Sequence, residues 1–331
     1  MTRAAVLGSG AWGTVFAKVL AEGGADVTIW GRRPAVVEEI RDRRTNQGSL
    51  PGVHLPERVT ATADLAAATD DADLIAIAVP SQTLRGNLAG WAGHFGPDAT
   101  VDSLMKGIEL GTTKRMSEVI VETAHVEPER VVVVSGPNIA PEIAEGQPTT
   151  TVVACIDEER AKRVQHALAV PYFRPYTSDD VVGCELGGAV KNVIALAYGM
   201  ATAMGMGDNT KASLITRGLA ETARLGLVLG AELTTFAGLA GLGDLVATCS
   251  SPLSRNRTFG EKLGRGMTVE QVQESTKQTA EGVKSCRSVL DLARAHGVDV
   301  PITEAVVRVC HEGESPNNMV REIMSREAKP E

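Results

Sequence analysis

R-A-A-V-L-G-S-G-A-W-G, residues 3–13, decides the fold of the first half of the chain. Its apolar beginning, Arg3–Gly8, has the length and composition of a short buried strand. The strand runs into a glycine turn and then into the helical run T-V-F-A-K-V-L-A-E-G. In this context Gly8 permits a tight turn, Gly10 lets a pyrophosphate approach the backbone, and Gly13 lets the helix pack on the strand. The stretch therefore predicts a dinucleotide-binding site, with an ordinary glycine turn as the alternative.

A second strand, Ala25–Trp30, ends in W-G-R-R-P, which indicates the type of dinucleotide. Sites for NAD usually carry Asp or Glu at this point to bind the ribose 2′-hydroxyl. This chain has Arg32 and Arg33 instead, whose guanidinium groups suit a 2′-phosphate. NADP(H) is the preferred cofactor on this evidence, with NAD(H) as a second one. The alternative interpretation is a pair of surface arginines in a loop.

Apolar strands and helical segments alternate as far as residue 178. The further strands are expected at Asp73–Pro80, Ala99–Leu104, Arg130–Pro137 and Thr149–Ile156. Continuous apolar strands separated by helices predict a largely parallel sheet covered on both faces. Beyond this point the pattern is almost wholly helical. We therefore expect an α/β fold with an N-terminal Rossmann-type dinucleotide-binding domain, residues 1–178, followed by an all-α substrate and catalytic domain, residues 179–331.

Lys191 is the one charged side chain in a long apolar stretch, residues 186–207. The stretch is typical of a buried helix, where an ammonium group is costly unless it is paired. Lys191 either snorkels to solvent, is paired from another segment, or gives its proton to chemistry. Asp244, in the glycine-rich segment G-L-A-G-L-G-D-L, is the candidate partner, and a helix N-cap is its alternative role.

Three further segments carry groups suited to an anionic ligand. S-R-N-R, residues 254–257, offers a guanidinium from Arg255 and single hydrogen bonds from Ser254 and Asn256, which suits a phosphate. Lys106 in S-L-M-K-G-I-E follows the carboxyl end of a strand, where α/β folds bind ligands. G-P-N-I-A, residues 136–140, follows another strand and offers backbone N–H groups. The alternative for S-R-N-R is a basic surface loop, and the alternative for Lys106 is a solvated loop lysine.

Composition argues against several classes of protein, among them nucleic-acid-binding, integral membrane and metal-binding proteins. The chain has 331 residues and a formal net charge of −8, which argues against nonspecific binding to nucleic acid or anionic membranes. The apolar stretch around Lys191 favours a soluble core helix over an integral membrane segment. Five scattered cysteines without C-x-x-C spacing predict free thiols and a cytoplasmic location. No metal site is predicted, because neither the cysteines nor the six histidines have ligand spacing.

Several motifs taken together resemble a known family. They are G-S-G-A-W-G-T, S-L-M-K-G-I-E, G-A-V-K-N-V-I-A-L-A-Y-G, G-D-N-T-K-A-S-L-I-T-R-G, G-L-A-G-L-G-D-L and S-R-N-R. In this order, from Val6 to about Glu314, the chain resembles bacterial NAD(P)-dependent glycerol-3-phosphate dehydrogenase. The resemblance implies the reversible reduction of dihydroxyacetone phosphate to sn-glycerol 3-phosphate, which supplies glycerophospholipid synthesis. It implies a small-molecule phosphate substrate, and we expect a homodimer.

The resemblance also implies roles for residues of this chain. Lys191 matches the proton donor and acceptor. The substrate positions are Lys106, Gly136, Asn138, Lys191, Asp244, Ser254, Arg255 and Asn256. The cofactor positions, with the glycines of the turn, are Gly8, Gly10, Ala11, Trp12, Gly13, Arg32, Arg33, Lys106, Ala140, Arg255, Thr279 and Glu281. Two positions depart from the family pattern: Asn138 replaces the usual Ser or Thr, and Thr279 replaces an apolar residue. Their direct contacts with ligands stay open.

Two other functions fit parts of the sequence. One is a different two-domain dehydrogenase of the 3-hydroxyacid or 6-phosphogluconate type, whose substrates are carboxylates. The other is a regulator that senses NAD(P)H without turnover. The regulator explains the glycine turn but neither a buried Lys191 nor the S-R-N-R segment.

Overall fold

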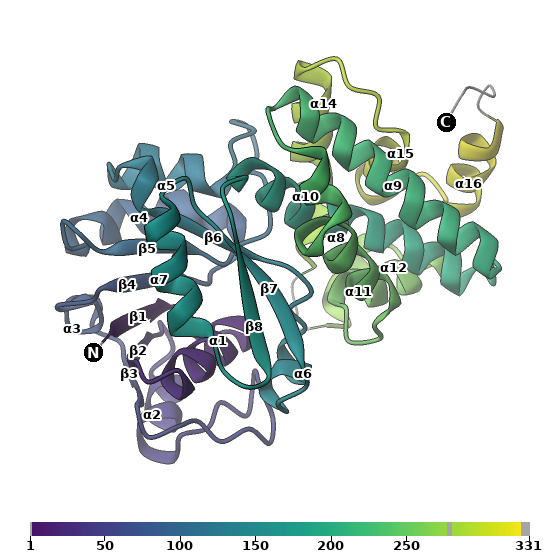
Figure 1. Ribbon diagram of the computed structural model, residues 1–331. Coiled ribbons are helices and arrows are strands. Elements are labelled where there is room, and N and C mark those ends of the chain that lie inside the picture. Colours follow the sequence, from purple (N-terminus) through teal and green to yellow (C-terminus); the bar gives the residue numbers. More distant parts are fainter. Residues whose placement is uncertain (1, 277–279, 326–331) are drawn as a thin grey trace. The chain divides into compact units, whose positions relative to one another are not determined.

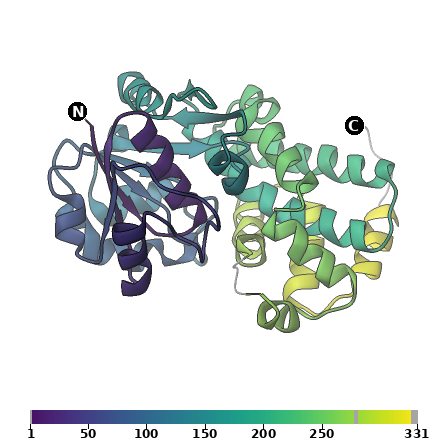
Figure 2. The same cartoon turned by 90° about the horizontal axis from the view of Figure 1, so that it is seen from below.

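The computed structural model describes residues 2–276 and 280–325, with side chains as far as residue 321. The chain divides into two compact units, drawn in Figures 1 and 2. Unit 1 contains Met1–Lys106 and Lys114–Glu185, and unit 2 contains Gly107–Thr113 and Leu186–Glu331.

Unit 1 is built on an eight-stranded sheet with the order β3-β2-β1-β4-β5-β6-β7-β8. Strands β1 to β6 are parallel, whereas β7 pairs antiparallel with β6 and parallel with β8. The predicted largely parallel sheet is confirmed. The strands are β1 (Arg3–Leu7), β2 (Asp26–Trp30), β3 (Val59–Thr62), β4 (Leu74–Ile77), β5 (Thr100–Ser103), β6 (Val131–Ser135), β7 (Thr149–Ala154) and β8 (Phe173–Ser178).

Helices pack on both faces of this sheet, as the alternating pattern predicts (Figure 1). Along β1, Ala4 and Val6 belong to one buried cluster, and Ala5 and Leu7 belong to another. The first cluster includes side chains of α1 (Ala11–Glu22), α2 (Pro34–Arg43), α6 (Ala140–Ala144) and α7 (Glu158–Leu168). The second includes side chains of α4 (Leu84–Trp91) and α5 (Met116–Ala124), and the short α3 (Leu65–Thr69) contacts β1, β2 and β3. The central strands β1, β4, β5 and β6 are thus almost fully buried, whereas the edge strand β8 alternates buried and exposed residues.

Unit 2 is built from helices, as Figure 2 shows for the green and yellow part of the chain. Its central helix, α8 (Val181–Ala203), begins in the last residues of unit 1. The others are α9 (Asp208–Val228), α10 (Leu233–Ala237), α11 (Asp244–Ser250), α12 (Arg255–Gly264), α13 (Val269–Glu274), α14 (Glu281–Ala295), α15 (Pro301–His311) and α16 (Pro316–Ser325). Helix α8 is long and apolar enough to cross a membrane by composition, but 83% of its most apolar window is buried inside the protein. It is a core helix, as predicted.

The short segment Gly107–Thr113 belongs to unit 2 although unit 1 flanks it on both sides in the sequence. Ile108 is fully buried, and its carbonyl accepts a hydrogen bond of 2.8 Å from the hydroxyl of Ser288 on α14. The chain therefore passes between the units at three points, the last of them inside α8 between Glu185 and Leu186.

Candidate active site

The glycine turn between β1 and α1 has the geometry of a phosphate cradle. Gly8 has φ +135°, and a Cβ added to it would lie 2.4 Å from the carbonyl oxygen of Ala78. A Cβ on Gly13 would lie 2.2 Å from the oxygen of Gly8, so both positions require glycine. A Cβ on Gly10 would meet nothing within 4 Å, which leaves the backbone open to a ligand. Gly10 also caps α1 without a side-chain bond, so the N–H groups of Ala11 and its neighbours remain for an anion.

A residue outside the predicted set holds this turn in place. The buried Asn46 donates from Nδ2 to the carbonyl of Ser9 at 3.0 Å and to the hydroxyl of Thr14 at 2.9 Å. Its position in a loop after α2 gave no signal in the sequence. At the end of β2, Arg32 and Arg33 are both exposed, and Arg33 caps α2. They are accessible to a ligand phosphate.

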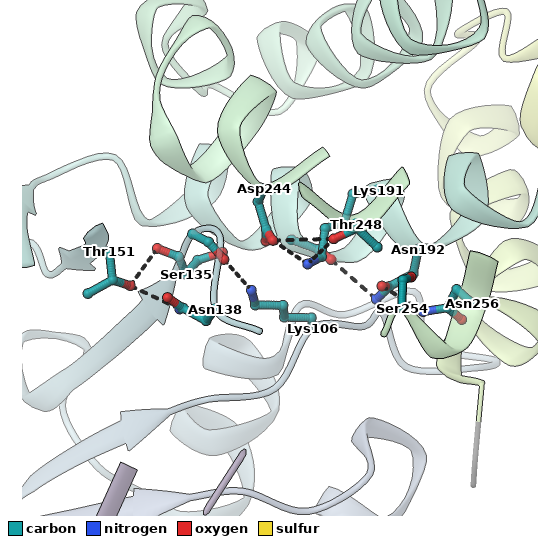
Figure 3. Close-up of polar contacts among 12 residues, drawn as sticks. Lys106, Ser135, Asn138, Thr151, Lys191, Asn192, Asp244, Thr248, Ser254 and Asn256 are labelled. Carbon is teal, nitrogen blue, oxygen red and sulfur yellow. Dashed lines mark hydrogen bonds and ion pairs between the residues drawn. The ribbon is translucent and has the colours of Figure 1, made fainter. Parts of the chain in front are cut away.

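The remaining predicted residues of unit 1 follow the ends of β5 and β6. Lys106 is partly buried, and its Nζ donates to the carbonyl of Gly136 at 2.9 Å (Figure 3). Gly136 has φ +144°, and a Cβ on it would lie 3.1 Å from the Cα of Thr151, so this turn also requires glycine. Ala140 begins α6. The fold thus brings Lys106, Gly136 and Asn138 together at one edge of the sheet.

Lys191 is buried in unit 2 and forms an ion pair with Asp244, as the sequence predicted (Figure 3). The side chain of Lys191 is 9% exposed and that of Asp244 is 1% exposed. Nζ of Lys191 also donates to the hydroxyl of Thr248 at 2.7 Å. Thr248 was not predicted, although its spacing of four residues from Asp244 puts both on one face of α11. Snorkelling to solvent is therefore the wrong interpretation of Lys191.

Small residues allow this pair to form. A Cβ on Gly187 of α8 would lie 2.3 Å from the carbonyl oxygen of Ala240. Ala240 belongs to a π-helical turn, Leu239–Gly243, that leads directly into α11. The glycine-rich segment thus brings its backbone next to Gly187 and leads into α11, which begins at Asp244.

S-R-N-R lies at the start of α12, and the three side chains predicted to bind a phosphate have different surroundings. Ser254 caps the helix by accepting from the N–H of Arg257. Asn256 is buried, donates to Oδ1 of Asn192 at 2.8 Å and accepts from the N–H of Gly282 at 2.9 Å. Arg255 is exposed and lines a pocket of about 240 Å³ together with Lys262. Arg255 is thus the accessible cation of the segment.

Two predicted cofactor residues follow α12 and α13 in the sequence. Glu281 is the first residue of α14, whereas Thr279 lies outside the described residues. All five cysteines are buried free thiols. Among the described residues the structure therefore holds a phosphate cradle, a buried paired ammonium and an accessible guanidinium.

Comparison with known proteins agrees with this set of groups. Residues 3–161 match the family described as NAD-dependent glycerol-3-phosphate dehydrogenase N-terminus, and residues 180–321 match the corresponding C-terminus. The chain is 64% identical to "Glycerol-3-phosphate dehydrogenase [NAD(P)+]" of Streptomyces griseus over 99% of its length and 98% of the relative's. Its identity to the protein of that name from Thermobifida fusca is 63%, over 100% of the chain and 99% of the relative.

A solved structure is similar over the whole chain. The crystal structure of glycerol-3-phosphate dehydrogenase from Coxiella burnetii has a TM-score of 0.94 and 36% sequence identity. The match covers 98% of this chain and 99% of that one. Both units therefore have the fold of a solved glycerol-3-phosphate dehydrogenase.

Proposed function

The chain belongs to the NAD-dependent glycerol-3-phosphate dehydrogenase family, and on that premise we propose that Lys191 is the proton donor and acceptor of its reaction. The enzyme interconverts dihydroxyacetone phosphate and sn-glycerol 3-phosphate, and both NADP(H) and NAD(H) fit it as cofactors. The bound nicotinamide supplies or removes the hydride at C2. The protein's own residues bind the phosphates of cofactor and substrate, and they add or remove the proton on the C2 oxygen.

The observation that carries this proposal is the buried ion pair of Lys191 with Asp244. During reduction, negative charge grows on the C2 oxygen, and an ammonium within hydrogen-bond reach stabilises it and then delivers the proton. Asp244 and Thr248, on one face of α11, both bind the Nζ atom and so fix the position of the ammonium. In the oxidation direction the same nitrogen takes the hydroxyl proton.

The other predicted residues have roles in binding. Gly8, Gly10, Ala11, Trp12 and Gly13 form the cradle for the pyrophosphate, and the open space beside Gly10 supports this. Arg255 binds the substrate phosphate, supported by its exposure at the start of α12. The remaining substrate positions are Lys106, Gly136, Asn138, Ser254 and Asn256, and the remaining cofactor positions are Arg32, Arg33, Lys106, Ala140, Arg255, Thr279 and Glu281. By function we assign residues 1–178 to dinucleotide binding and residues 179–331 to substrate binding and catalysis; the compact units differ from this division at residues 107–113 and 179–185.

The experiment that tests the central role is Lys191→Ala, assayed by NADPH absorbance with dihydroxyacetone phosphate. We expect kcat to fall by roughly 10²–10⁴, the effect of losing a general acid, while the Kd for NADPH stays within about twofold. Lys162→Ala, on the exposed side of α7, is the matched control and should keep wild-type kcat. A folded Lys191→Ala enzyme with near wild-type kcat would show that another group moves the proton.

The biological setting is a finer part of the proposal. We infer a cytoplasmic enzyme, supported by five buried free thiols, that supplies sn-glycerol 3-phosphate to glycerophospholipid synthesis. We also infer a homodimer. Three exposed apolar side chains where α9 ends and α10 begins, Leu227, Val228 and Leu233, support association of two copies.

A further inference from the structure

A short chain of hydrogen bonds fixes the turn that follows β6 (Figure 3). The hydroxyl of Thr151, on the neighbouring strand β7, donates to the carbonyl of Ser135 at 3.1 Å. The same hydroxyl oxygen accepts from Nδ2 of Asn138 at 3.0 Å. Thr151 is fully buried, so water does not compete for these bonds.

This chain of bonds determines which way the amide of Asn138 faces. A threonine hydroxyl has one proton, and a backbone carbonyl only accepts. Because Thr151 gives its proton to Ser135, it offers Asn138 only an acceptor, so the NH₂ group of Asn138 must face it. The carbonyl oxygen Oδ1 therefore faces away from Thr151. Oδ1 is buried and accepts no hydrogen bond from the described residues.

The turn itself has little freedom to move. Gly136 lies against the backbone of Thr151, with 3.1 Å between a Cβ built on Gly136 and the Cα of Thr151. The carbonyl of Gly136 also accepts from Nζ of Lys106. Asn138 thus lies on a turn with a constrained backbone, and among the described residues its side chain hydrogen-bonds to Thr151 alone.

The chemistry of the substrate indicates what an acceptor in this position recognises. Dihydroxyacetone phosphate carries a phosphate, a ketone oxygen and one free hydroxyl, and of these only the hydroxyl donates a hydrogen bond. We propose that Thr151 is a positioning residue that orients Asn138 so that Oδ1 accepts the free hydroxyl of the substrate. This inference rests on the proposed function, which puts Asn138 among the substrate-binding residues, and it adds the group that Asn138 recognises and the residue through which it is set.

The test uses hydroxyacetone phosphate, which has the ketone and phosphate of the substrate but lacks the free hydroxyl. We expect wild type to prefer dihydroxyacetone phosphate in kcat/KM by roughly 10–10²-fold, because the deoxy compound leaves a buried acceptor unpaired. Asn138→Ala should reduce this preference to within about threefold. Thr151→Val, which keeps the shape but removes the hydroxyl, should reduce it about as far. Thr151→Ser is the matched control and should keep it.

A double variant separates positioning from general damage to the fold. If Thr151 acts through Asn138, adding Thr151→Val to Asn138→Ala should leave the substrate preference unchanged. An unchanged preference in Thr151→Val, or a further loss in the double variant, would overturn the proposal. A raised KM for NADPH with the preference intact would assign Oδ1 to the cofactor instead, which also overturns it. Thr151→Ala replaces Thr151→Val if the valine variant does not fold.

This outcome is independent of the role of Lys191. Lys191→Ala lowers kcat on both ketones, so their ratio, measured at high enzyme concentration, still reports the hydroxyl. If Lys191 is not the proton donor, kcat of Lys191→Ala stays near that of wild type. If Thr151 does not orient Asn138, the ratio of kcat/KM for the two ketones stays unchanged in Thr151→Val.

Discussion

At the scale of single residues, Arg32 and Arg33 are the side chains that we expect to discriminate between the two cofactors. Replacing both Arg32 and Arg33 by Ala should cost on the order of 1–3 kcal/mol in kcat/KM for NADPH and much less for NADH, because only NADPH has a 2′-phosphate to lose. Steady-state kinetics with each cofactor measures this. Arg41→Ala with Arg43→Ala, at the far end of α2, is the control pair. Equal losses with the two cofactors would contradict this role.

Arg255 should account for much of the binding of the substrate, since a triose offers few groups other than its phosphate. Arg255→Ala should lower kcat/KM for dihydroxyacetone phosphate by about 10²-fold, and Arg255→Lys should recover part of it, because a point charge does not reproduce the guanidinium fork. Unphosphorylated dihydroxyacetone should be a very poor substrate and should be affected far less. Arg265→Ala, at the other end of α12, controls for lost surface charge. The same fractional loss of kcat/KM on both ketones would show that Arg255 does not bind the substrate phosphate.

The elements around Lys191 depend on one close approach, that of α8 to the π-helical turn at Gly187. Gly187→Ala should lower the free energy of unfolding by about 1–3 kcal/mol, because its Cβ meets the backbone oxygen of Ala240. Relief of that clash moves α11, so kcat should fall as well. Thermal unfolding and kcat measure the two effects. Gly90→Ala, in α4 with open space around it, should be neutral or stabilising, and a similarly mild result at Gly187 would contradict the packing argument.

At the scale of elements, the sequence predicted six of the eight strands of the sheet. Strands β1, β4 and β6 have apolar runs, and β2, β5 and β7 were predicted although they contain polar residues, whereas β3, with two threonines in four residues, was missed. No strand was predicted at β8, which contains Pro175, a residue that a strand accepts most readily at the edge of a sheet. The reversed direction of β7 depends on long-range pairing that local sequence does not encode.

The same division applies to the candidate site. Lys191 and Asp244 were predictable because a charge in an apolar helix requires a partner. Asn46 and Thr151 were not, since each is an ordinary polar residue that becomes informative only through contacts with distant parts of the chain. Residues that act by positioning other residues are therefore difficult to identify from a single sequence.

The stability of the molecule should depend on Glu221, which joins two helices of unit 2. Its buried carboxylate accepts from the N–H groups of Ile302 and Thr303 at the start of α15. Burial raises its pKa to about 7, although these N–H donors oppose the shift. Between pH 4.5 and about 7, Glu221 is therefore protonated in the folded state and ionised in the unfolded state. Its contribution to stability is therefore full below about pH 4.5 and is lost as the pH rises through 7.

Glu221→Gln should accordingly flatten the dependence of the unfolding free energy on pH between 5 and 8, by an amount on the order of a few kcal/mol. Denaturant unfolding of both proteins across this range measures the difference. Glu274→Gln, at an exposed site on α13, should leave the slope of wild type unchanged. Parallel curves for wild type and Glu221→Gln would show that Glu221 has the same pKa in both states.

The assembled molecule is expected to be a pair of chains. Light scattering should give twice the chain mass of 34.8 kDa, and Leu227→Lys with Leu233→Lys should reduce it to that of one chain. Leu110→Lys, another exposed leucine, serves as the control. A wild-type mass equal to one chain would contradict the homodimer.

The passage of residues 107–113 into unit 2 limits how this enzyme can be recombined with its relatives. A chimera that takes its first 178 residues from another species also takes residues 107–113 from that species, and this segment, with the fully buried Ile108, belongs to unit 2. We therefore expect that the two halves do not exchange freely between species, and that a hybrid folds best when residues 107–113 come from the same protein as the helices of unit 2. Gene-shuffling libraries with a single crossover near α8 should yield fewer folded hybrids than libraries that restore residues 107–113.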